Sequence, residues 1–284
     1  MGQSIVPIVA MVTGESIIRC LGTGFFIGCD GLLVTAAHVV TDPIERKYGG
    51  VREVDQKNWS MGDLKLGVMV RTNSFDQPGY FFCPIEWATF LGDRSECPLP
   101  IAASDLRLTV DTAICKVTPF SEKIPFQPLS IIQPGIRGVG LNIGKGATAI
   151  GYAGMHDIDL KIENGRVEVG KFQFDLHVSR GKILERFPNN GIDKEVSTPG
   201  PCFSASLKLP PGMSGSPILD EDKIYVHGVA SKGLADGNGP TDLSYGSMLA
   251  ASLRLRLPQL ANKSLLDFML AEEQGITGLS IPDA

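Results

Sequence analysis

The chain has 284 residues, 43% hydrophobic and 20% charged, and can therefore bury the core of one large domain or of two small ones. Its formal net charge of −5, with no long basic run, argues against a nucleic-acid or anionic-membrane partner. Its 33 glycines and 19 prolines are spread along the chain, which favours many short strands joined by turns.

The N-terminal residues carry no basic group ahead of the first apolar run, as a signal peptide would. Val6 stands where N-myristoylation needs serine or threonine. No window holds the ~20 apolar residues that a membrane helix requires. We therefore expect a soluble, cytoplasmic protein.

The six cysteines cannot be the main scaffold of so long a chain, and none lies in a Cys-x-x-Cys pair or a cluster with zinc spacing. Two alternatives stay open for them, buried hydrophobic thiols and disulfides, and the pattern favours thiols. The sequence predicts no metal site and no organic cofactor.

In chain order, the first predicted element is a strand over residues 4–13, in which Pro7 indicates a sheet edge or the entry to a sheet. Two β-rich runs follow at 16–20 and 24–28. An apolar strand is then expected over 32–40, running through small residues into a histidine.

Residues 41–104 are polar and rich in turns, and we expect elaborated surface loops there, with a strand or two. A half-buried strand is expected over 106–117, and the Pro- and Gly-rich segment 119–146 is the best candidate for a linker between two halves. The periodicity of 259–274 predicts an amphipathic helix. Further strands are expected at 147–152, 166–169, 172–178, 202–209, 223–231 and 244–255.

Residues 209–218 form a tight loop in which Gly212 and Gly215 lie close on either side of Ser214. Glycine lets the backbone take turns that are closed to other residues and lets another backbone approach. Such a loop can present the Ser214 hydroxyl together with N–H groups aimed at one point, as an oxyanion hole requires. Serine is a weak nucleophile until a base takes its proton, so the loop alone is also typical of a simple turn.

A base and an acid are available elsewhere in the chain. Ala36 and Ala37 are too small to cover the ring of His38, which favours a reactive histidine over one satisfied in the core. Asp111 opens an apolar run, where a carboxylate needs a partner such as an imidazole N–H. Asp105 is the alternative carboxylate, but the run after Asp111 is the more convincing buried strand.

These residues fit one mechanism. Ser214 would attack, His38 would take its proton and return it to the leaving amine, and Asp111 would fix the imidazole tautomer. The N–H groups of Gly212 and Ser214 would hold the oxyanion. An α/β-hydrolase would run Ser, Asp, His and would need glycine at Ser216, so that fold is excluded.

The segments 35–38 (TAAH), 111–114 (DTAI) and 212–217 (GMSGSP) resemble the three signatures of the chymotrypsin-like serine endopeptidases. The third is more similar to the bacterial, HtrA-like and viral branches than to digestive trypsins. The resemblance extends over residues 4–255. It implies an all-β fold of two packed antiparallel six-stranded β-barrels, to which the periodicity adds a C-terminal α-helix.

The expected division of the chain follows from this resemblance. The parts are an N-terminal barrel (1–125) with His38 and Asp111, a C-terminal barrel (126–255) with Ser214, and a C-terminal helix and tail (256–284).

The resemblance also implies residues that contact a substrate. The segment 229–233 would pair with the substrate backbone by strand addition. Lys208 lies six residues before Ser214, where the family often has the floor of its specificity pocket. The alternative for Lys208 is an exposed strand end with its ammonium in solvent. The expected substrate-binding residues are Lys208, Ala230, Ser231, Lys232 and Gly233.

Two positions depart from the trypsin pattern. Met213 stands where trypsin-type zymogens keep the aspartate that pairs with a new N-terminus, so activation by that salt bridge is not expected. Val39 stands where digestive relatives carry a cysteine. Nothing that resembles a PDZ domain follows, so an HtrA-style oligomer regulated by peptides is not supported.

The sequence therefore predicts a serine endopeptidase whose partners are protein or peptide substrates, with an activating protein as a further candidate partner. No nucleic acid or membrane is expected. The alternative is a catalytically silent or partner-activated protease fold that serves as a binding or scaffold module. The three intact signatures speak against that alternative.

Overall fold

The computed structural model of the protein describes residues 4–27, 31–55, 58–72, 79–92, 95–98, 108–118, 126, 129, 131–132, 142–163, 166–169, 174–187, 198–199, 201–221, 225–236, 239–253, 256–270 and 279–280.

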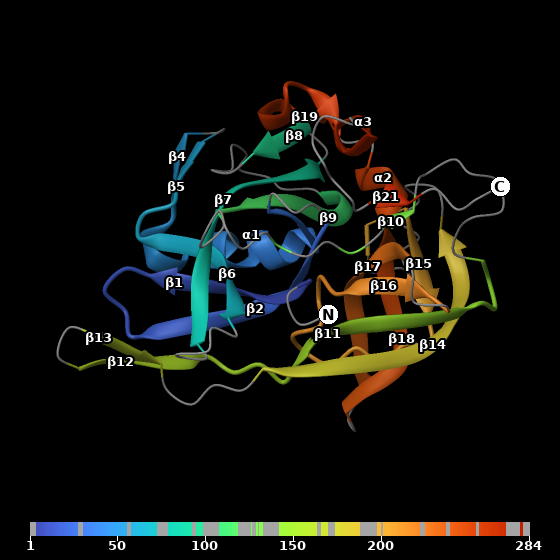
Figure 1. The fold of residues 1–284 in the computed structure, drawn as a ribbon, viewed down its shortest axis with the longest axis horizontal. Helices are drawn as coiled ribbons and strands as arrows, with labels where there is room; N and C mark the ends of the chain where they lie inside the picture. The colour runs from blue at the N-terminus through green and yellow to red at the C-terminus, as the bar shows by residue number, and fades with distance from the viewer. Residues whose placement is uncertain are drawn as a thin grey trace.

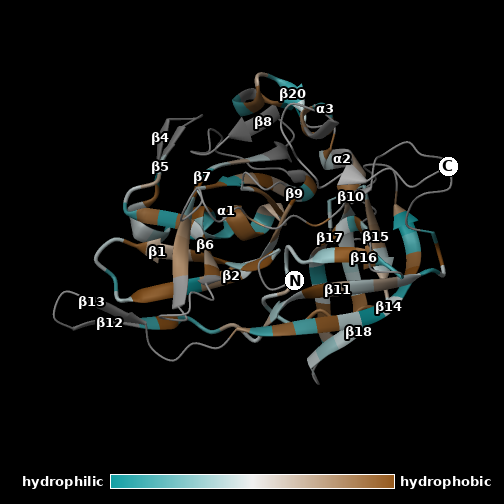
Figure 2. Cartoon of the chain, in the orientation of Figure 1, coloured by the Kyte–Doolittle hydropathy of each residue, from teal (hydrophilic) through white to brown (hydrophobic). Residues whose placement is uncertain are grey.

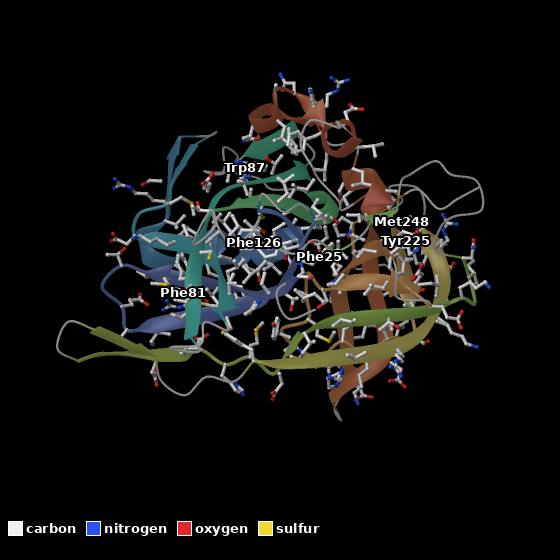
Figure 3. The ribbon with its side chains drawn as sticks, viewed as in Figure 1. Phe25, Phe81, Trp87, Phe126, Tyr225 and Met248 are labelled. Carbon is white, nitrogen blue, oxygen red and sulfur yellow. The ribbon has the colours of Figure 1, made fainter. Side chains whose placement is uncertain are left out.

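Six antiparallel strands close into the first barrel in the order β1-β6-β7-β9-β3-β2, because β1 pairs with β2 as well as with β6 (Figure 1). Phe26 is fully buried and stacks on Phe126, which is labelled in Figure 3, with ring centroids 4.0 Å apart. The bounds of these strands are Ile5–Val12 (β1), Ile17–Phe26 (β2), Leu32–Thr35 (β3), Leu64–Thr72 (β6), Gly79–Gly92 (β7) and Leu108–Val117 (β9).

Six more antiparallel strands close the second barrel in the order β16-β11-β14-β15-β18-β17, with β16 pairing β17. Phe203 is fully buried in its core. The bounds are Gly146–Ala153 (β11), Asp175–Phe187 (β14), Cys202–Ala205 (β15), Pro217–Asp220 (β16), Val226–Asp236 (β17) and Gly239–Met248 (β18). The predicted all-β fold of two six-stranded barrels is confirmed.

The prediction of surface loops over 41–104 is wrong for β6 and β7, which are barrel strands. β6 pairs with β1 and β7, and β7 pairs with β6 and β9. The sequence signal is weak because β7 contains Pro84 and Glu86, both exposed, so its alternation of apolar residues is interrupted. Residues of β6 and β7 are buried because these strands pair with strands that are distant in the sequence, and a local sequence pattern does not show such pairing.

The strand expected over 32–40 is also wrong in its second half. β3 ends at Thr35, and a helix, α1 (Ala37–Glu45), begins two residues later. The run of Val39 and Val40 is buried on this helix, so an apolar stretch that favoured a strand is equally compatible with a buried helix face. His38 therefore lies in the first turn of a helix.

The C-terminal segment is more broken than the predicted helix over 259–274. Pro258–Leu260 forms a 3₁₀ turn, and Ala261 and Asn262 then take left-handed backbone angles that end it. A helix, α3 (Leu265–Leu270), follows; residues 271–278 lie outside the described residues. Leu249–Ser252 (α2) is helical where a strand was expected.

Smaller elements decorate the barrels. The hairpin of β12 (Ile158–Glu163) and β13 (Arg166–Val169) leaves the second barrel and pairs with β2, which extends the sheet of the first barrel (Figure 1). The others are the 3₁₀ turn Tyr48–Gly50 and the strands Arg52–Asp55 (β4), Asn58–Ser60 (β5), Ser95–Pro98 (β8), Ile131–Ile132 (β10), Arg256–Leu257 (β19), Lys263–Ser264 (β20) and Leu279–Ser280 (β21). Among the described helices, none is long and apolar enough to cross a membrane.

The two barrels share one apolar seam. Ile150, Leu219 and Val229 of the second barrel belong to the same cluster of buried side chains as the interior of the first. The hydrophobic stretches of β1, β2 and β6 contrast with the hydrophilic residues along β14 in Figure 2. Burial of this seam fixes the two barrels against each other, which is what a site built from both requires.

The core of the second barrel depends on Phe203. A Cβ added at Gly228 or Gly246 would lie 2.6 or 2.5 Å from its ring, so the ring fills the space between these glycines. Phe203→Ala should lower the free energy of unfolding by about 3–5 kcal/mol, measured by urea denaturation. Leu184→Ala, at a side chain 47% exposed, is the control and should change it by less than ~0.5 kcal/mol. Equal losses would contradict this account of the core.

Candidate active site

A pocket of about 440 Å³ lies between the barrels and contains His38, Asp111 and Ser214 in its wall. These residues come from α1, β9 and the loop before β16, which are separated by 73 and 103 positions in the chain. The fold thus brings together the three predicted residues. The described residues that line it are His38, Asp111, Pro199, Leu209, Pro210, Pro211, Ser214, Ala230, Ser231, Lys232, Gly233, Leu234, Ala235 and Pro240.

Asp111 holds His38 at two points. Its Oδ2 lies 2.8 Å from Nδ1 of the imidazole, and its Oδ1 accepts the backbone N–H of His38 at 3.0 Å. The N–H groups in the first turn of a helix have no partner within the helix, so the carboxylate also serves as the cap of α1. This arrangement makes Nδ1 the protonated nitrogen and leaves Nε2 as the basic one.

Ser231 supplies a further hydrogen bond to the same carboxylate. Its hydroxyl donates to Oδ2 of Asp111, and the Thr198 hydroxyl lies 3.3 Å from it. We expected Ser231 to contact a substrate, and the sequence has no signal that its side chain would reach a residue 120 positions away. With three donors the carboxylate, only 3% exposed, is fully satisfied.

The two ionisable groups shift each other's pKa in opposite directions. Burial alone would lower the pKa of His38, but the hydrogen bond and charge of Asp111, with the charges of Asp42 and Glu45, outweigh it and raise that pKa above its ordinary value. Burial likewise works to raise the pKa of Asp111, but the hydrogen bonds from His38 and Ser231 and the charge of His38 bring it below its ordinary value. Asp111 is therefore an anion beside a basic imidazole.

Ser214 lines the pocket, and its hydroxyl donates to the carbonyl oxygen of Ser231 at 3.3 Å. No hydrogen bond joins His38 and Ser214, two described residues. The contact of nucleophile and base is often loose in the absence of substrate and tightens only when substrate binds.

In its turn, from Gly212 to Ser216, the serine loop (residues 209–216) leaves two N–H groups unused. Met213 donates its N–H to the carbonyl of Pro210, and Gly215 donates its own to the carbonyl of Ala230. The N–H of Ser216 is donated to the carbonyl of Met213. The N–H groups of Gly212 and Ser214 find no acceptor among the described residues. These are the two donors that the sequence predicts for an oxyanion hole.

The loop is anchored by packing where trypsin-type enzymes use a salt bridge. The side chain of Met213 is fully buried in the core of the second barrel. Gly212 and Gly215 have φ of +97° and +88°, which favour glycine. The turn that exposes Ser214 therefore depends on these two glycines and on burial of the methionine between them.

One edge of β17 is open beside Ser214. β16 pairs with β17 as far as Val229, and Ala230 still exchanges hydrogen bonds with Gly215 and Ser216. Past Ala230, β17 pairs only with β18 among the described strands. Ala230, Ser231, Lys232 and Gly233 line the pocket, and their contact with a substrate stays a prediction.

Lys208 differs from the other predicted contacts. It is exposed and is not among the residues that line the pocket, and its backbone N–H donates to the Ser179 hydroxyl at 2.8 Å. The exposure of Lys208 favours the alternative prediction of an ammonium in solvent, although the residue lies three positions past the end of β15. The rival carboxylate Asp105 lies outside the described residues.

The described cysteines Cys20, Cys83, Cys115 and Cys202 are thiols. Burial raises the pKa of Cys115 to about 12, which makes it an inert core residue. Within the described ranges, no group of three or more His, Cys, Asp and Glu side chains could hold a metal ion.

A family model described as the trypsin-like peptidase domain matches residues 22–229, well over half of the chain, and the protein therefore belongs to that family. The resemblance to chymotrypsin-like serine endopeptidases is confirmed. No curated protein sequence matches the chain.

Two solved structures share the fold. The chain is similar to Deg5, with a TM-score of 0.53 and 14% identity over 99% of this chain and 92% of that one. It is also similar to the protease domain of MamO from Magnetospirillum magneticum in its apo form, with a TM-score of 0.51 and 11% identity over 88% of this chain and 94% of that one. Identities this low show a common fold and nothing more.

The His38 imidazole should titrate above the ~6.5 of an ordinary histidine, followed by NMR of the ring protons. Asp111→Asn removes the main group that raises the pKa of His38. Burial lowers that pKa, so the midpoint of the titration should move to lower pH. Asp42→Asn removes only a more distant charge and should lower the midpoint by less. An unchanged midpoint in Asp111→Asn would mean that the carboxylate does not set this pKa.

Proposed function

We propose that the protein is an active serine endopeptidase that cleaves peptide bonds through an acyl-enzyme intermediate, with no metal or organic cofactor. The observation that carries this proposal is the hydrogen-bonded pair of Asp111 and His38 in one pocket with Ser214. Membership of the trypsin-like peptidase family supports a protease that acts on proteins or peptides.

The proposed reaction gives each group of the site a defined role. His38 Nε2 accepts the proton of the Ser214 hydroxyl as the oxygen attacks the peptide carbon, and Asp111 stabilises the imidazolium that forms. The N–H groups of Gly212 and Ser214 stabilise the oxyanion. The imidazolium then gives its proton to the leaving amine, and water hydrolyses the acyl-enzyme by the same steps.

Substrate binding would prepare the nucleophile. The carbonyl of Ser231 faces the open edge of β17, and in the unliganded protein it accepts the Ser214 hydroxyl. A substrate strand that pairs with this edge would donate its own N–H to that carbonyl. The hydroxyl would then turn to His38.

The pocket indicates which residue precedes the cleaved bond. Apart from His38, Asp111 and Ser214 its wall is mostly apolar, and the one ammonium among the described lining residues belongs to Lys232, which is exposed. We infer that an apolar side chain fits there and that charged ones are disfavoured, because burial of an unpaired charge is costly. The apolar lining residues are Pro199, Leu209, Pro210, Pro211, Ala230, Leu234, Ala235 and Pro240.

The second candidate is a silent or partner-activated protease fold that binds other proteins. The hydrogen bond of the Ser214 hydroxyl to Ser231, in place of one to His38, favours this candidate, since a nucleophile turned from its base is at rest. The satisfied Asp111 and the unused N–H donors favour the active enzyme, because a binding module has no need of them.

Ser214→Ala should lower turnover of a peptide or protein substrate by about five to six orders of magnitude, because the three groups act as a unit. It should also abolish labelling by a fluorophosphonate probe. Ser216→Ala, two residues away at a buried hydroxyl with no partner, is the matched control and should keep both.

Three outcomes separate the candidates. Labelling of the isolated protein at Ser214 supports the active enzyme. Labelling only after another protein is added supports the partner-activated form. A wild-type protein that neither labels nor cleaves under either condition leaves the binding module, and turnover that survives in Ser214→Ala refutes the assignment of the nucleophile.

A peptide library cleaved by the protein should show enrichment of apolar residues immediately before the cleaved bond. Lys208→Glu should leave that profile unchanged, because this ammonium lies outside the pocket. A preference for acidic residues that disappears in Lys208→Glu would restore Lys208 to the pocket and contradict the apolar assignment.

A further inference from the structure

Thr23 is a fully buried residue of β2, on the first barrel, that hydrogen-bonds to the serine loop of the second. Its N–H donates to the carbonyl of Ser214 at 2.8 Å, and its hydroxyl donates to the carbonyl of Gly212 at 2.9 Å. The same hydroxyl accepts the N–H of Tyr152 at 3.0 Å, and the Thr35 hydroxyl donates to the Thr23 carbonyl at 2.7 Å.

Elementary chemistry determines which group donates in the hydrogen bond between the Thr23 hydroxyl and the Gly212 carbonyl. A threonine hydroxyl has one proton to donate and lone pairs to accept with. The N–H of Tyr152 can only donate, so the hydroxyl must use its proton on the carbonyl of Gly212. Every hydrogen-bonding group of Thr23 therefore has a partner within the protein, and the residue is fully buried from solvent.

These bonds hold the peptide groups that surround the unused donors. The carbonyls of Gly212 and Ser214 belong to the peptide groups on either side of the one that carries the Ser214 N–H. The carbonyl of Pro211 accepts the N–H of Gly154 at 3.1 Å, so in a trans peptide the N–H of Gly212 points away from Gly154. The carbonyl of Met213, in the same peptide group as the Ser214 N–H, accepts the N–H of Ser216, and Thr23 holds the peptide groups on either side of it.

The first barrel lies too close to the loop for it to reorient freely. A Cβ added at Gly22 would lie 2.8 Å from the carbonyl oxygen of Ser214, and one at Gly215 would overlap Thr23 and Thr35. The loop therefore rests directly on the backbone of β2. The second barrel adds the packing of the buried Met213 and the hydrogen bonds of Met213, Gly215 and Ser216, and no ion pair among the described residues.

We propose that the Thr23 hydroxyl is a positioning group that holds the N–H donors of Gly212 and Ser214 in their working orientation from the opposite barrel. The proposal rests on the proposed peptidase function. In trypsin-type enzymes the aspartate at the position of Met213 forms a buried salt bridge. In this protein a hydrogen bond between the barrels takes the role of that salt bridge. Thr23 touches no substrate and acts through the peptide groups that do.

The test is Thr23→Val, which keeps the size of the side chain and the backbone N–H but removes the hydroxyl. We expect kcat to fall about 10- to 100-fold, a part of the cost of losing an oxyanion donor, with KM within about twofold. Thr23→Ser restores the hydroxyl and should recover kcat to within about threefold. Thr23→Ala, which lacks the same hydroxyl, replaces the valine variant should that one fail to fold.

Thr89→Val is the matched control. Thr89 is also fully buried in the first barrel, but its hydroxyl has no hydrogen-bond partner. This change should leave kcat unaltered. The proposal is overturned by an unchanged kcat in Thr23→Val, by an equal loss in Thr23→Ser, or by an equal loss in Thr89→Val.

Hydrogen exchange separates this proposal from the proposed function. The N–H groups of Met213, Gly215 and Ser216 are hydrogen-bonded and should exchange at least tenfold faster in Thr23→Val than in the wild type or in Thr89→Val. If the wild type shows no turnover or labelling, the peptidase function fails, while faster exchange still supports the anchoring of the loop. Unchanged exchange overturns the anchoring whether or not the protein is an enzyme.

Discussion

The site depends on one buried anion. The carboxylate of Asp111 lies among apolar residues of the first barrel, where an unpaired charge would be prohibitively costly. Its partners are two groups of His38, at the start of α1, and the hydroxyl of Ser231, on a strand of the other barrel. Because all its donors must be present together, the carboxylate fixes the imidazole and ties the two barrels together at the pocket.

The seam between the barrels at this point consists largely of backbone. Gly22 and Gly215 allow β2 and the serine loop to approach within contact distance, and a side chain at either position would collide with the opposite segment. Hydrogen bonds from Thr23 then replace side-chain packing across the gap. The partly exposed Ser214 is thus carried on a loop whose backbone is held from both sides, by β2 of the first barrel and by the buried Met213 within its own barrel.

Much of the site could be predicted because its residues lie in short segments with recognisable patterns. Small residues before His38, a carboxylate at the start of an apolar run and glycines around Ser214 are local features, and their order along the chain excludes the α/β-hydrolase fold. The family match and the two closed barrels agree with that prediction. The strands that were missed, β6 and β7, have interrupted patterns and owe their place to pairing with β1 and β9.

The sequence by itself determined which residue types are available to form the site, and that the chain folds into β-rich halves around them. Only the tertiary structure decided what each hydroxyl binds and which side chains the pocket contains. Ser231 reaches Asp111 across 120 positions, Thr23 reaches Gly212 across 189, and Lys208 turns to solvent. The physical reason is that a hydrogen bond depends on distance and direction between groups in space, and local sequence carries neither for segments so far apart.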